Sequence, residues 1–542
     1  MTPENIREIA RRRTFAIISH PDAGKTTLTE KLLLYAGAIQ LAGSVRAKKK
    51  QAAVTSDWME LERQRGISIT STVLEFEYQG HQINLLDTPG HEDFSEDTFR
   101  TLAAVDSAVM VLDRAKGIES QTRKLFQVCR MRGIPIFAFI NKMDRPGRDP
   151  LALLGEIEAV LGIRAAPLNW PIGEGDRFQG IFDRERQVAY RFDRTDHGQS
   201  AGTFETHVLG EPGFERAFPD AEGRAVLREE LELLEVAGES FDPEQFLNGR
   251  LVPVFFGSAL TNFGVQPFLN RFVELAPPPR ARLASGQLVA PESEHFSGFI
   301  FKVQSNMDPR HRDSIAFLRV CSGRLDRGMT ALHARTGKPV RLDRASRLFG
   351  QERETLDCAY PGDIVGLPNT SQFVVGDTLC TGPLVHYDEI PRFQPEHFAV
   401  LRNKDIARFK NFRKGLDQLE DEGAIQVLHR MEAIRKEPIL AAVGRLQFDV
   451  VQFRLKSEYN VDTALEPLEY QLARWIQGEE SLLEELAKGA YGPLWLTDKD
   501  GARVLLFRSE WEGKRYAEQH DEVTLLAVAR RGIPKGGIGR PQ

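Results

Sequence analysis

The sequence is poor in several features that would have defined its class. It has only 4 cysteines among 542 residues, scattered and without a C-x-x-C pair, which argues against a disulfide scaffold and a cysteine-rich zinc site. Its net charge is only −6, from 71 basic and 77 acidic residues, so a uniformly basic coat for nucleic acid is excluded. Its apolar runs are far too short to cross a bilayer, and no apolar core of a secretory signal follows the N-terminus. These absences predict a soluble, cytoplasmic protein with no membrane partner.

The chain does have the length and apolar content for several hydrophobic cores. Its 542 residues correspond to about three or four domains of roughly 150 residues each. The shares of hydrophobic and charged residues, 41% and 27%, are ordinary for globular proteins.

Residues 1–280 have the pattern of a doubly wound α/β domain. Short, continuous apolar runs are typical of parallel strands that are covered on both faces. Between them lie segments with helical periodicity, such as 25–36, where Leu28, Leu32 and Tyr35 share one face. The runs that predict strands are 15–18, 83–86, 108–112, 134–140 and 252–256.

From about residue 162 to residue 250 this alternation is lost, which predicts an insertion before the last strand. Residues 201–250 hold twelve acidic residues against four arginines. Such an excess is typical of a solvated helical surface, and a docking face for a basic partner is the alternative.

Two further regions follow a stiff linker of three prolines at 277–279. Residues 290–388 contain short strand-like runs separated by Gly, Asp and Pro, which favours an antiparallel β-barrel. Residues 389–542 mix both kinds of element and predict an α+β domain. Within it we expect helices at 414–422 and 424–435 and strands at 439–443 and 448–451.

A phosphate-binding loop, or P-loop, follows the first predicted strand. The segment SHPDAGKTT matches the pattern G-x-x-x-x-G-K-[ST], with serine in place of the first glycine. Loop N–H groups and the positive end of the next helix surround phosphate oxygens in such a loop, while the lysine reaches the β- and γ-phosphates and the next hydroxyl binds Mg²⁺. The expected nucleotide contacts are Ser19, His20, Pro21, Asp22, Ala23, Gly24, Lys25, Thr26 and Thr27.

The second strand ends in the segment DTPGH, which predicts a sensor of the γ-phosphate. An aspartate at this edge reaches the metal through water, and the glycine brings a backbone N–H to the γ-phosphate. The histidine is the candidate for placing the attacking water, either as a neutral or as a cationic imidazole. These residues are Asp87, Thr88, Pro89, Gly90 and His91.

Two later segments predict that the base is guanine. In NKMD, Asp144 offers two acceptor oxygens to the ring N–H and the amine of guanine, a donor pair that adenine lacks. Lys142 can lie along the base plane, and Asn141 can tie its loop to the P-loop. After the last strand, the middle residue of a tripeptide can offer its N–H to the guanine carbonyl; the tripeptide is Ser258, Ala259 and Leu260. Each motif alone is weak, but their order after successive strands predicts a site for GTP or GDP.

The segment ELERQRGISITS, residues 60–71, offers a second hydroxyl for Mg²⁺ at Ser68 or Thr70. We expect it to be ordered while the γ-phosphate is present and released after hydrolysis. No arginine finger in cis is evident, so hydrolysis by the chain alone should be slow and a partner should activate it.

The segments RGISIT, DTPGH and NKMD resemble the translational GTPases, the family that includes elongation factors Tu and G. The resemblance covers the α/β domain and the barrel, favours Ser68 over Thr70, and implies a GTPase that uses Mg²⁺. Two positions depart from the pattern, because Ser68 stands for a threonine and Ser19 for a glycine. The resemblance implies that the metal ligands are Thr26, Ser68 and Asp87, that the base is held by Asn141, Lys142 and Asp144, and that the catalytic residues are His91, Lys25 and Asp22.

Within this family, ISHPDAGKTTLTEKLL, SDWMELERQRGISITSTVLEF and LRNKDIARFKNFRKGLDQLEDEGAIQV resemble the branch that acts in translation termination. The likeness spans nearly the whole chain and implies a monomeric GTPase that the ribosome activates. Its expected partners are the ribosome, through rRNA and ribosomal proteins, and the class I release factors, whose dissociation it promotes after peptide release. The alternatives are another elongation-factor-like GTPase, either ribosomal or regulating a metabolic enzyme, and a nucleotide-gated scaffold that does not hydrolyse GTP.

Residues 402–414 carry six basic residues and one acid, interleaved with Phe409 and Phe412. This composition fits either an amphipathic element with a solvated basic side or a surface that contacts rRNA phosphates or an acidic factor.

The guanine assignment predicts the behaviour of Asp144→Asn. Replacing one acceptor oxygen by a donor should move the preference of the site from guanosine toward xanthosine nucleotides. Competition between labelled GTP and xanthosine triphosphate measures this preference. If xanthosine triphosphate still fails to compete, Asp144 does not read the base.

Overall fold

The computed structural model describes residues 2–39, 70–193, 200, 202–305, 314–349, 352–369, 372–387, 394–431, 437–488 and 492–527. The chain forms two compact units, residues 1–390 and 391–542, which are described separately below. Among the described residues, none of the helices has the length and apolar character needed to span a membrane.

A seven-stranded sheet forms the centre of the first unit, with the order β2-β3-β1-β4-β5-β11-β6. β2 is antiparallel to β3 and the other neighbours are parallel. Every residue of β1, β4, β5 and β11 is buried, as continuous apolar runs require. The strands are β1 Arg12–Ser19, β2 Thr72–Tyr78, β3 His81–Asp87, β4 Ser107–Asp113, β5 Ile136–Asn141, β6 Arg164–Pro167 and β11 Leu251–Phe256.

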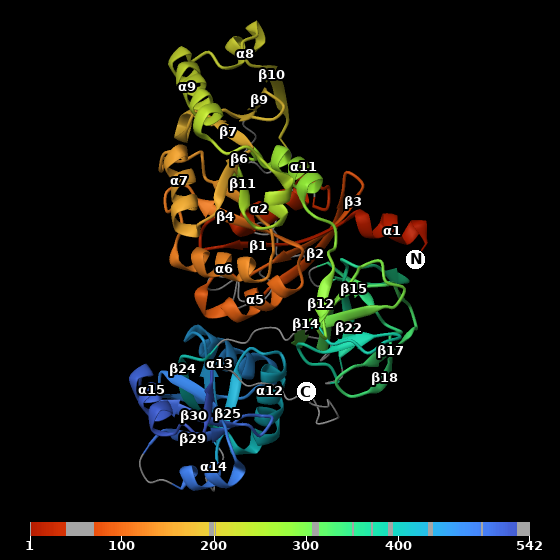
Figure 1. Ribbon diagram of the computed structural model, residues 1–542, viewed down its shortest axis with the longest axis vertical. Helices are drawn as coiled ribbons and strands as arrows, with labels where there is room; N and C mark the ends of the chain where they lie inside the picture. The colour runs from red at the N-terminus through yellow and green to blue at the C-terminus, as the bar shows by residue number, and fades with distance from the viewer. Residues whose placement is uncertain are drawn as a thin grey trace, which may run out of the picture. The chain divides into compact units, whose positions relative to one another are not determined.

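Helices join these strands and confirm the doubly wound α/β architecture (Figure 1). α2 begins directly after the P-loop, and its Leu28 and Leu32 pack into the same core as Phe15 of β1 and Phe272 of α11. The helices are α2 Lys25–Tyr35, α5 Ser95–Ala103, α6 Ser120–Met131, α7 Pro150–Leu161 and α11 Val265–Leu275.

Between β6 and β11 the chain forms a second, four-stranded antiparallel sheet, with the order β10-β9-β8-β7. β6 itself still belongs to the seven-stranded sheet, where it pairs with β11. We use "insertion" for residues 169–247, which Figure 1 shows next to the β6 edge. Its elements are β7 Asn169–Ile172, β8 Gly180–Asp183, β9 Val188–Phe192, β10 Phe204–Val208, α8 Pro212–Ala217, α9 Ala221–Ala237 and α10 Pro243–Leu247.

Residues 297–380 form an eight-stranded antiparallel sheet around one apolar core, which confirms the antiparallel architecture expected there. Its order is β18-β17-β23-β14-β15-β22-β19-β20, and a short β16–β21 pair, Leu325–Asp326 with Cys358–Ala359, accompanies it. The eight strands are β14 Ser297–Ser305, β15 Ser314–Ser322, β17 Thr330–His333, β18 Lys338–Arg341, β19 Ser346–Phe349, β20 Glu352–Thr355, β22 Ile364–Asn369 and β23 Thr378–Cys380.

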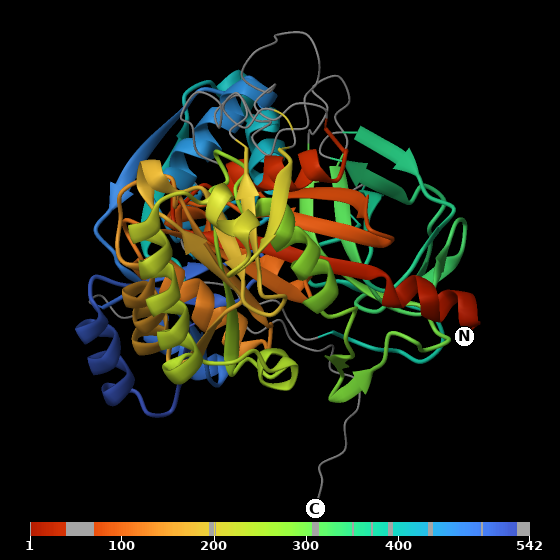
Figure 2. The same cartoon turned by 90° about the horizontal axis from the view of Figure 1, so that it is seen from above.

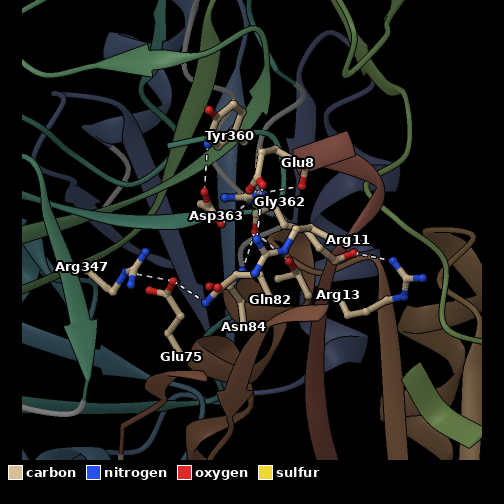
Figure 3. A network of polar contacts seen from close by, with 12 residues as sticks. Glu8, Arg11, Arg13, Glu75, Gln82, Asn84, Arg347, Tyr360, Gly362 and Asp363 are labelled. Carbon is tan, nitrogen blue, oxygen red and sulfur yellow. Dashed lines mark hydrogen bonds and ion pairs between the residues drawn. The ribbon is translucent and has the colours of Figure 1, made fainter. Parts of the chain in front are cut away.

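Buried polar contacts join this barrel to the edge of the α/β domain, where both views show β2 and β3 extending toward the green strands (Figures 1 and 2). The carbonyl oxygen of Gly362 accepts hydrogen bonds from Thr14 Oγ1 at 2.7 Å, Asn84 Nδ2 at 3.3 Å and Arg319 Nη1 at 2.7 Å. Beside it, Arg12 Nε donates to Asp363 Oδ1 at 2.7 Å, and Figure 3 shows Asp363 next to Gly362. Donors that converge on one buried carbonyl fix the position of the barrel strongly, because separation would leave several buried groups unsatisfied.

The second unit contains an eight-stranded sheet with the order β27-β24-β26-β25-β29-β30-β28-β31 and helices packed on it, which confirms the expected α+β class. The strands are β24 His397–Asn403, β25 Gln426–Arg430, β26 Ile439–Ala442, β27 Thr463–Leu468, β28 Leu472–Gln477, β29 Leu494–Thr497, β30 Arg503–Phe507 and β31 Thr524–Leu526. The helices are α12 Phe409–Asp421, α13 Leu446–Tyr459, α14 Glu480–Ala487 and α15 Glu510–Gln519.

Two local predictions in this unit are wrong. The helix expected at 424–435 contains strand β25 instead, in which Val427 and Leu428 enter two different cores on opposite faces. The strand expected at 448–451 is part of helix α13, because Phe448, Val451 and Leu455 recur at helical spacing and pack into one core. In both cases short apolar runs fitted either period, and tertiary packing decided between them.

Glu75 on β2 predicts a pH dependence of stability. Its side chain is buried at the contact with the barrel, where Arg347 Nε lies 3.0 Å away and Gln82 Nε2 donates at 2.7 Å (Figure 3). Burial, with a smaller contribution from Asp363, raises the pKa of Glu75 from 4.5 to about 8. The folded protein therefore holds a proton that the unfolded chain loses above its lower pKa, so stability falls as pH rises from about 4.5 to 8.

We expect Glu75→Gln to remove this loss and to stabilise the protein at pH 8 by on the order of a few kcal/mol, with little effect near pH 5. Thermal unfolding of the full chain across this pH range measures the effect. Glu77→Gln, at an exposed carboxylate on the same strand, should change stability by less than about 0.5 kcal/mol at either pH. Equal pH profiles for Glu75→Gln and the unaltered chain would contradict the assignment.

Candidate functional site

The P-loop lies between β1 and α2 at the carboxyl edge of the seven-stranded sheet. Its backbone turns through left-handed conformations at Asp22 (φ 65°) and Gly24 (φ 97°), and Lys25 then begins the helix. A side chain at Gly24 would meet Asn141, because a Cβ there would lie 2.3 Å from its Nδ2 atom. Thr26 and Thr27 are half-buried in the first turn of α2. The turn thus presents N–H groups and the positive helix end to one space, as phosphate binding requires.

Asn141, the last residue of β5, connects the P-loop to the loop after β11. Its Nδ2 atom donates to the Ala23 carbonyl at 2.8 Å, and its Oδ1 atom accepts from the Ala259 N–H at 2.9 Å. The expected tie to the P-loop is therefore present in the structure. The Ala259 N–H, which the sequence had assigned to the guanine carbonyl, has Asn141 as its partner here.

The two charged residues of NKMD lie beside this connection. Lys142 Nζ donates to the Asp22 carbonyl at 2.6 Å and to Asp113 Oδ2 at 2.7 Å, so its ammonium is held between the P-loop and the end of β4. Burial opposes ionisation of Asp113, but the Lys142 ammonium and the Ala115 N–H hold its pKa below the ordinary value. Asp144 keeps a buried Oδ1 atom with no hydrogen-bond partner among the described residues. An orphaned, buried carboxylate oxygen fits a ligand that supplies an N–H donor.

Lys25 and DTPGH meet at the ends of β1 and β3. Lys25 Nζ lies 3.2 Å from Asp87 Oδ1 and donates to the Thr88 carbonyl, and all three residues are buried. Thr88 Oγ1 donates to the Ile17 carbonyl at 2.7 Å, which fixes this loop to the strand before the P-loop. Gly90 faces the P-loop, because a Cβ there would lie 3.7 Å from the Pro21 Cα. The structure therefore brings the two predicted phosphate-binding segments together.

His91 lies at the surface end of the same loop, with 36% of its side chain exposed. Its Nδ1 atom accepts from the Asp93 N–H at 3.4 Å and lies 3.2 Å from Asp93 Oδ1, and its ring is 6.3 Å from Phe94. The imidazole thus retains an exposed edge beside its contacts with Asp93 and Phe94.

Two predicted site residues have other surroundings. Ser258 Oγ accepts from the Thr261 N–H at 3.3 Å, which shapes the loop, and the Leu260 side chain is 46% exposed. Ser68, the predicted metal ligand, lies outside the described residues.

His20 has an environment that its place in the motif does not reveal. It is buried, neither ring nitrogen has a hydrogen-bond partner among the described residues, and Glu119 Oε2 lies 3.7 Å from its Nε2 atom. Burial lowers the pKa of His20 below its ordinary value, against the pull of Glu119, so the imidazole is neutral at physiological pH.

Sequence reasoning missed Lys302, which approaches the site from the barrel. Its buried Nζ atom donates to the Ser71 carbonyl and lies 3.1 Å from Ser71 Oγ and 3.8 Å from Asp97 Oδ2. The Ser71 N–H in turn donates to Asp97. Ser71 ends the segment 60–71, and Asp97 lies on α5 just after DTPGH, so one barrel cation contacts both. Only its place in a strand otherwise rich in apolar residues marked Lys302 as unusual.

The described side chains do not form a metal site by themselves. No group of three or more His, Cys, Asp and Glu residues among them is arranged to hold an ion. Mg²⁺ commonly takes phosphate oxygens and waters together with only one or two protein ligands, so Thr26 and Asp87 fit such a site.

Comparison with known proteins agrees with this geometry. Residues 10–278 match the elongation factor Tu GTP binding domain, 295–382 match elongation factor G domain 2, and 387–517 match the class II release factor RF3, C-terminal domain. Proteins named peptide chain release factor 3 are 56% identical in Gloeobacter violaceus, over 97% of this chain and 99% of that protein, and 56% identical in Synechococcus elongatus, over 96% and 93%. The chain belongs to the peptide chain release factor 3 family.

A solved structure from Thermus thermophilus shares the fold, with a TM-score of 0.66 and 23% identity, and the match covers 87% of this chain and 71% of that one. Membership of the release factor 3 family makes the chain a translational GTPase that acts in termination, and the site described above lies in the part that matches the GTP-binding domain.

Proposed function

We propose that this protein hydrolyses GTP on the ribosome and thereby promotes dissociation of class I release factors after peptide release. The match of residues 387–517 carries this proposal, because the GTP-binding domain and the barrel are common to translational GTPases with other tasks. In this proposal the three domains are residues 1–280, 290–388 and 389–542. The protein acts as a monomer in the cytoplasm.

The proposed chemistry uses the residues gathered at the carboxyl edge of the sheet. Asn141, Lys142 and Asp144 hold the guanine base, and the P-loop with Lys25 holds the phosphates. Mg²⁺ bound through Thr26, Ser68 and Asp87 would neutralise part of the phosphate charge. Since Lys25 is already paired with Asp87 at 3.2 Å, its ammonium has a carboxylate to stabilise it whenever the phosphates leave.

His91 is the residue that we assign to the attacking water. Its loop is fixed at Thr88, while its ring is partly exposed and its described contacts are with Asp93 and Phe94. These contacts do not fix the orientation of the imidazole by themselves, so contact with the ribosome has to complete it. This explains why hydrolysis by the isolated protein should be slow.

His91→Ala should leave GTP binding unchanged and reduce ribosome-stimulated hydrolysis by about 100-fold or more. Nucleotide titration and phosphate release with and without ribosomes measure the two effects. His81→Ala, at the first residue of β3 on the opposite edge of the sheet, is the matched control and should affect neither. Loss of GTP binding in His91→Ala would show that the histidine is structural.

The whole proposal is tested by the departure of a labelled class I release factor from ribosomes after peptide release. The protein with GTP should accelerate departure, and the protein without nucleotide or His91→Ala with GTP should do so less. If the protein binds and hydrolyses GTP on ribosomes but departure is unchanged, the task in termination is wrong.

We further propose that the basic residues at the start of α12 and just before it contact rRNA phosphates. In the second unit, Lys404, Lys410 and Lys414 are exposed and have no ion pair among the described residues, and Phe409 is 57% exposed beside them. Asp405 is occupied in capping, because its carboxylate accepts the Ala407 N–H at 2.9 Å. Unpaired cations around an exposed ring suit a phosphate backbone with accessible bases.

Replacing Lys404, Lys410 and Lys414 by Gln should weaken ribosome binding. It should also make the negative slope of log K against log salt less steep by about two to three. Binding measured from about 50 to 200 mM salt gives this slope. The control replaces Lys488, Arg508 and Lys514, which are exposed elsewhere in the same unit. An unchanged slope in the first variant, or equal slopes in the two, would show that these lysines form a solvated surface and do not contact rRNA.

A further inference from the structure

The insertion contacts the loop that follows β11, on the side of the predicted base site. Phe263 comes directly after the segment 258–262, and its ring stacks on Phe192 of β9, with centroids 5.1 Å apart and an interplanar angle of 21°. Phe178 packs against the same ring at 5.7 Å. All three rings are buried. The insertion thus provides two of the aromatic side chains that hold this loop.

The insertion also contacts the NKMD loop. The Gly175 N–H donates to the Met143 carbonyl at 2.9 Å, and the carboxylate of Glu174 pairs with the guanidinium of Arg114. Arg114 Nη1 donates to the Arg145 carbonyl at 3.1 Å, so this ion pair extends the contact to the residue after Asp144.

The two loops are joined to each other as well. The Met143 N–H donates to the Gly257 carbonyl at 3.2 Å, and Asn141 contacts Ala259. Asn262 Nδ2 donates to the carbonyl of Ser200, a residue in the connection between β9 and β10. These contacts of the insertion therefore fall on the base side of the site, away from the phosphate-binding segments.

We propose that the insertion is a brace for the two base-recognition loops and sets the rate at which guanine nucleotides leave. In this arrangement Phe178 and Phe192 are positioning residues, because they act on the nucleotide through Phe263 and the backbone of its loop. The base leaves only when the loops separate, and separation breaks the ring stack. Since the base is common to both nucleotides, the brace slows departure of GTP and GDP by the same factor. This inference rests on the proposed nucleotide site.

The test uses the full chain and measures dissociation rates of fluorescent GDP and of a fluorescent, non-hydrolysable GTP analogue by chase with unlabelled nucleotide. Phe192→Leu keeps apolar volume but removes the ring, and it should raise both rates by the same factor, roughly threefold to tenfold. Phe178→Leu should act in the same direction, and it serves if Phe192→Leu fails to fold.

Phe214→Leu is the matched control. Phe214 is an equally buried ring in α8 of the insertion, and its partner is Phe218 rather than Phe263, with centroids 5.1 Å apart. Its rates should stay within about twofold of those of the unaltered chain, while all variants should bind one nucleotide per chain.

The brace is refuted if neither Phe192→Leu nor Phe178→Leu changes the rates, if Phe214→Leu raises them equally, or if only one of the two nucleotides is affected. These results leave the proposed function intact, because it fails by a different observation, namely that the unaltered chain shows no preference for guanine nucleotides.

Discussion

The side-chain amide of Asn141 is the interaction on which the site depends. One amide joins the P-loop, at Ala23, to the loop after β11, at Ala259, so the phosphate-binding and base-binding segments are held at a fixed separation. The amide is buried at the end of a central strand, and its two bonds run to backbone groups of residues that are buried as well. Removing it would strand a buried donor and a buried acceptor, which costs more than the bonds themselves contribute. The absence of a side chain at Gly24 follows from the same contact, since a Cβ would occupy the place of the amide.

Around this connection, two lysines of the site are each paired with a carboxylate of the protein. Lys25 lies against Asp87, and Lys142 lies against Asp113. Each ammonium is thus held beside a carboxylate, and at the buried Lys25 this avoids an uncompensated charge. The barrel adds Lys302, which contacts residues next to both segments expected to respond to the γ-phosphate.

Much of this architecture could be predicted from the sequence, for a physical reason. Parallel strands covered on both faces need continuous apolar runs, so such strands can be located in the sequence. Motifs that directly follow these runs must lie at one edge of the sheet. Lys25, Asp87 and Asn141 are found together there, as expected. Contacts between side chains of distant segments leave no comparable pattern in the sequence. Nothing local marks Lys302 as a partner of Ser71, because that pair exists only once the elements pack. The same limit explains β25 and α13, whose short apolar runs satisfied both periods until packing selected one.

The carbonyl of Gly362 has a consequence for how this molecule can move. Three donors from two strands of the α/β domain and one strand of the barrel converge on that single oxygen, beside the pair between Arg12 and Asp363. A hinge at this seam would have to break the bonds from Thr14 and Asn84 and the pair between Arg12 and Asp363 at once. The α/β domain and the barrel are therefore expected to turn together as one rigid body. A change of shape at the nucleotide site is then expected to fall on the loops at the carboxyl edge of the sheet rather than on the contact between the two domains.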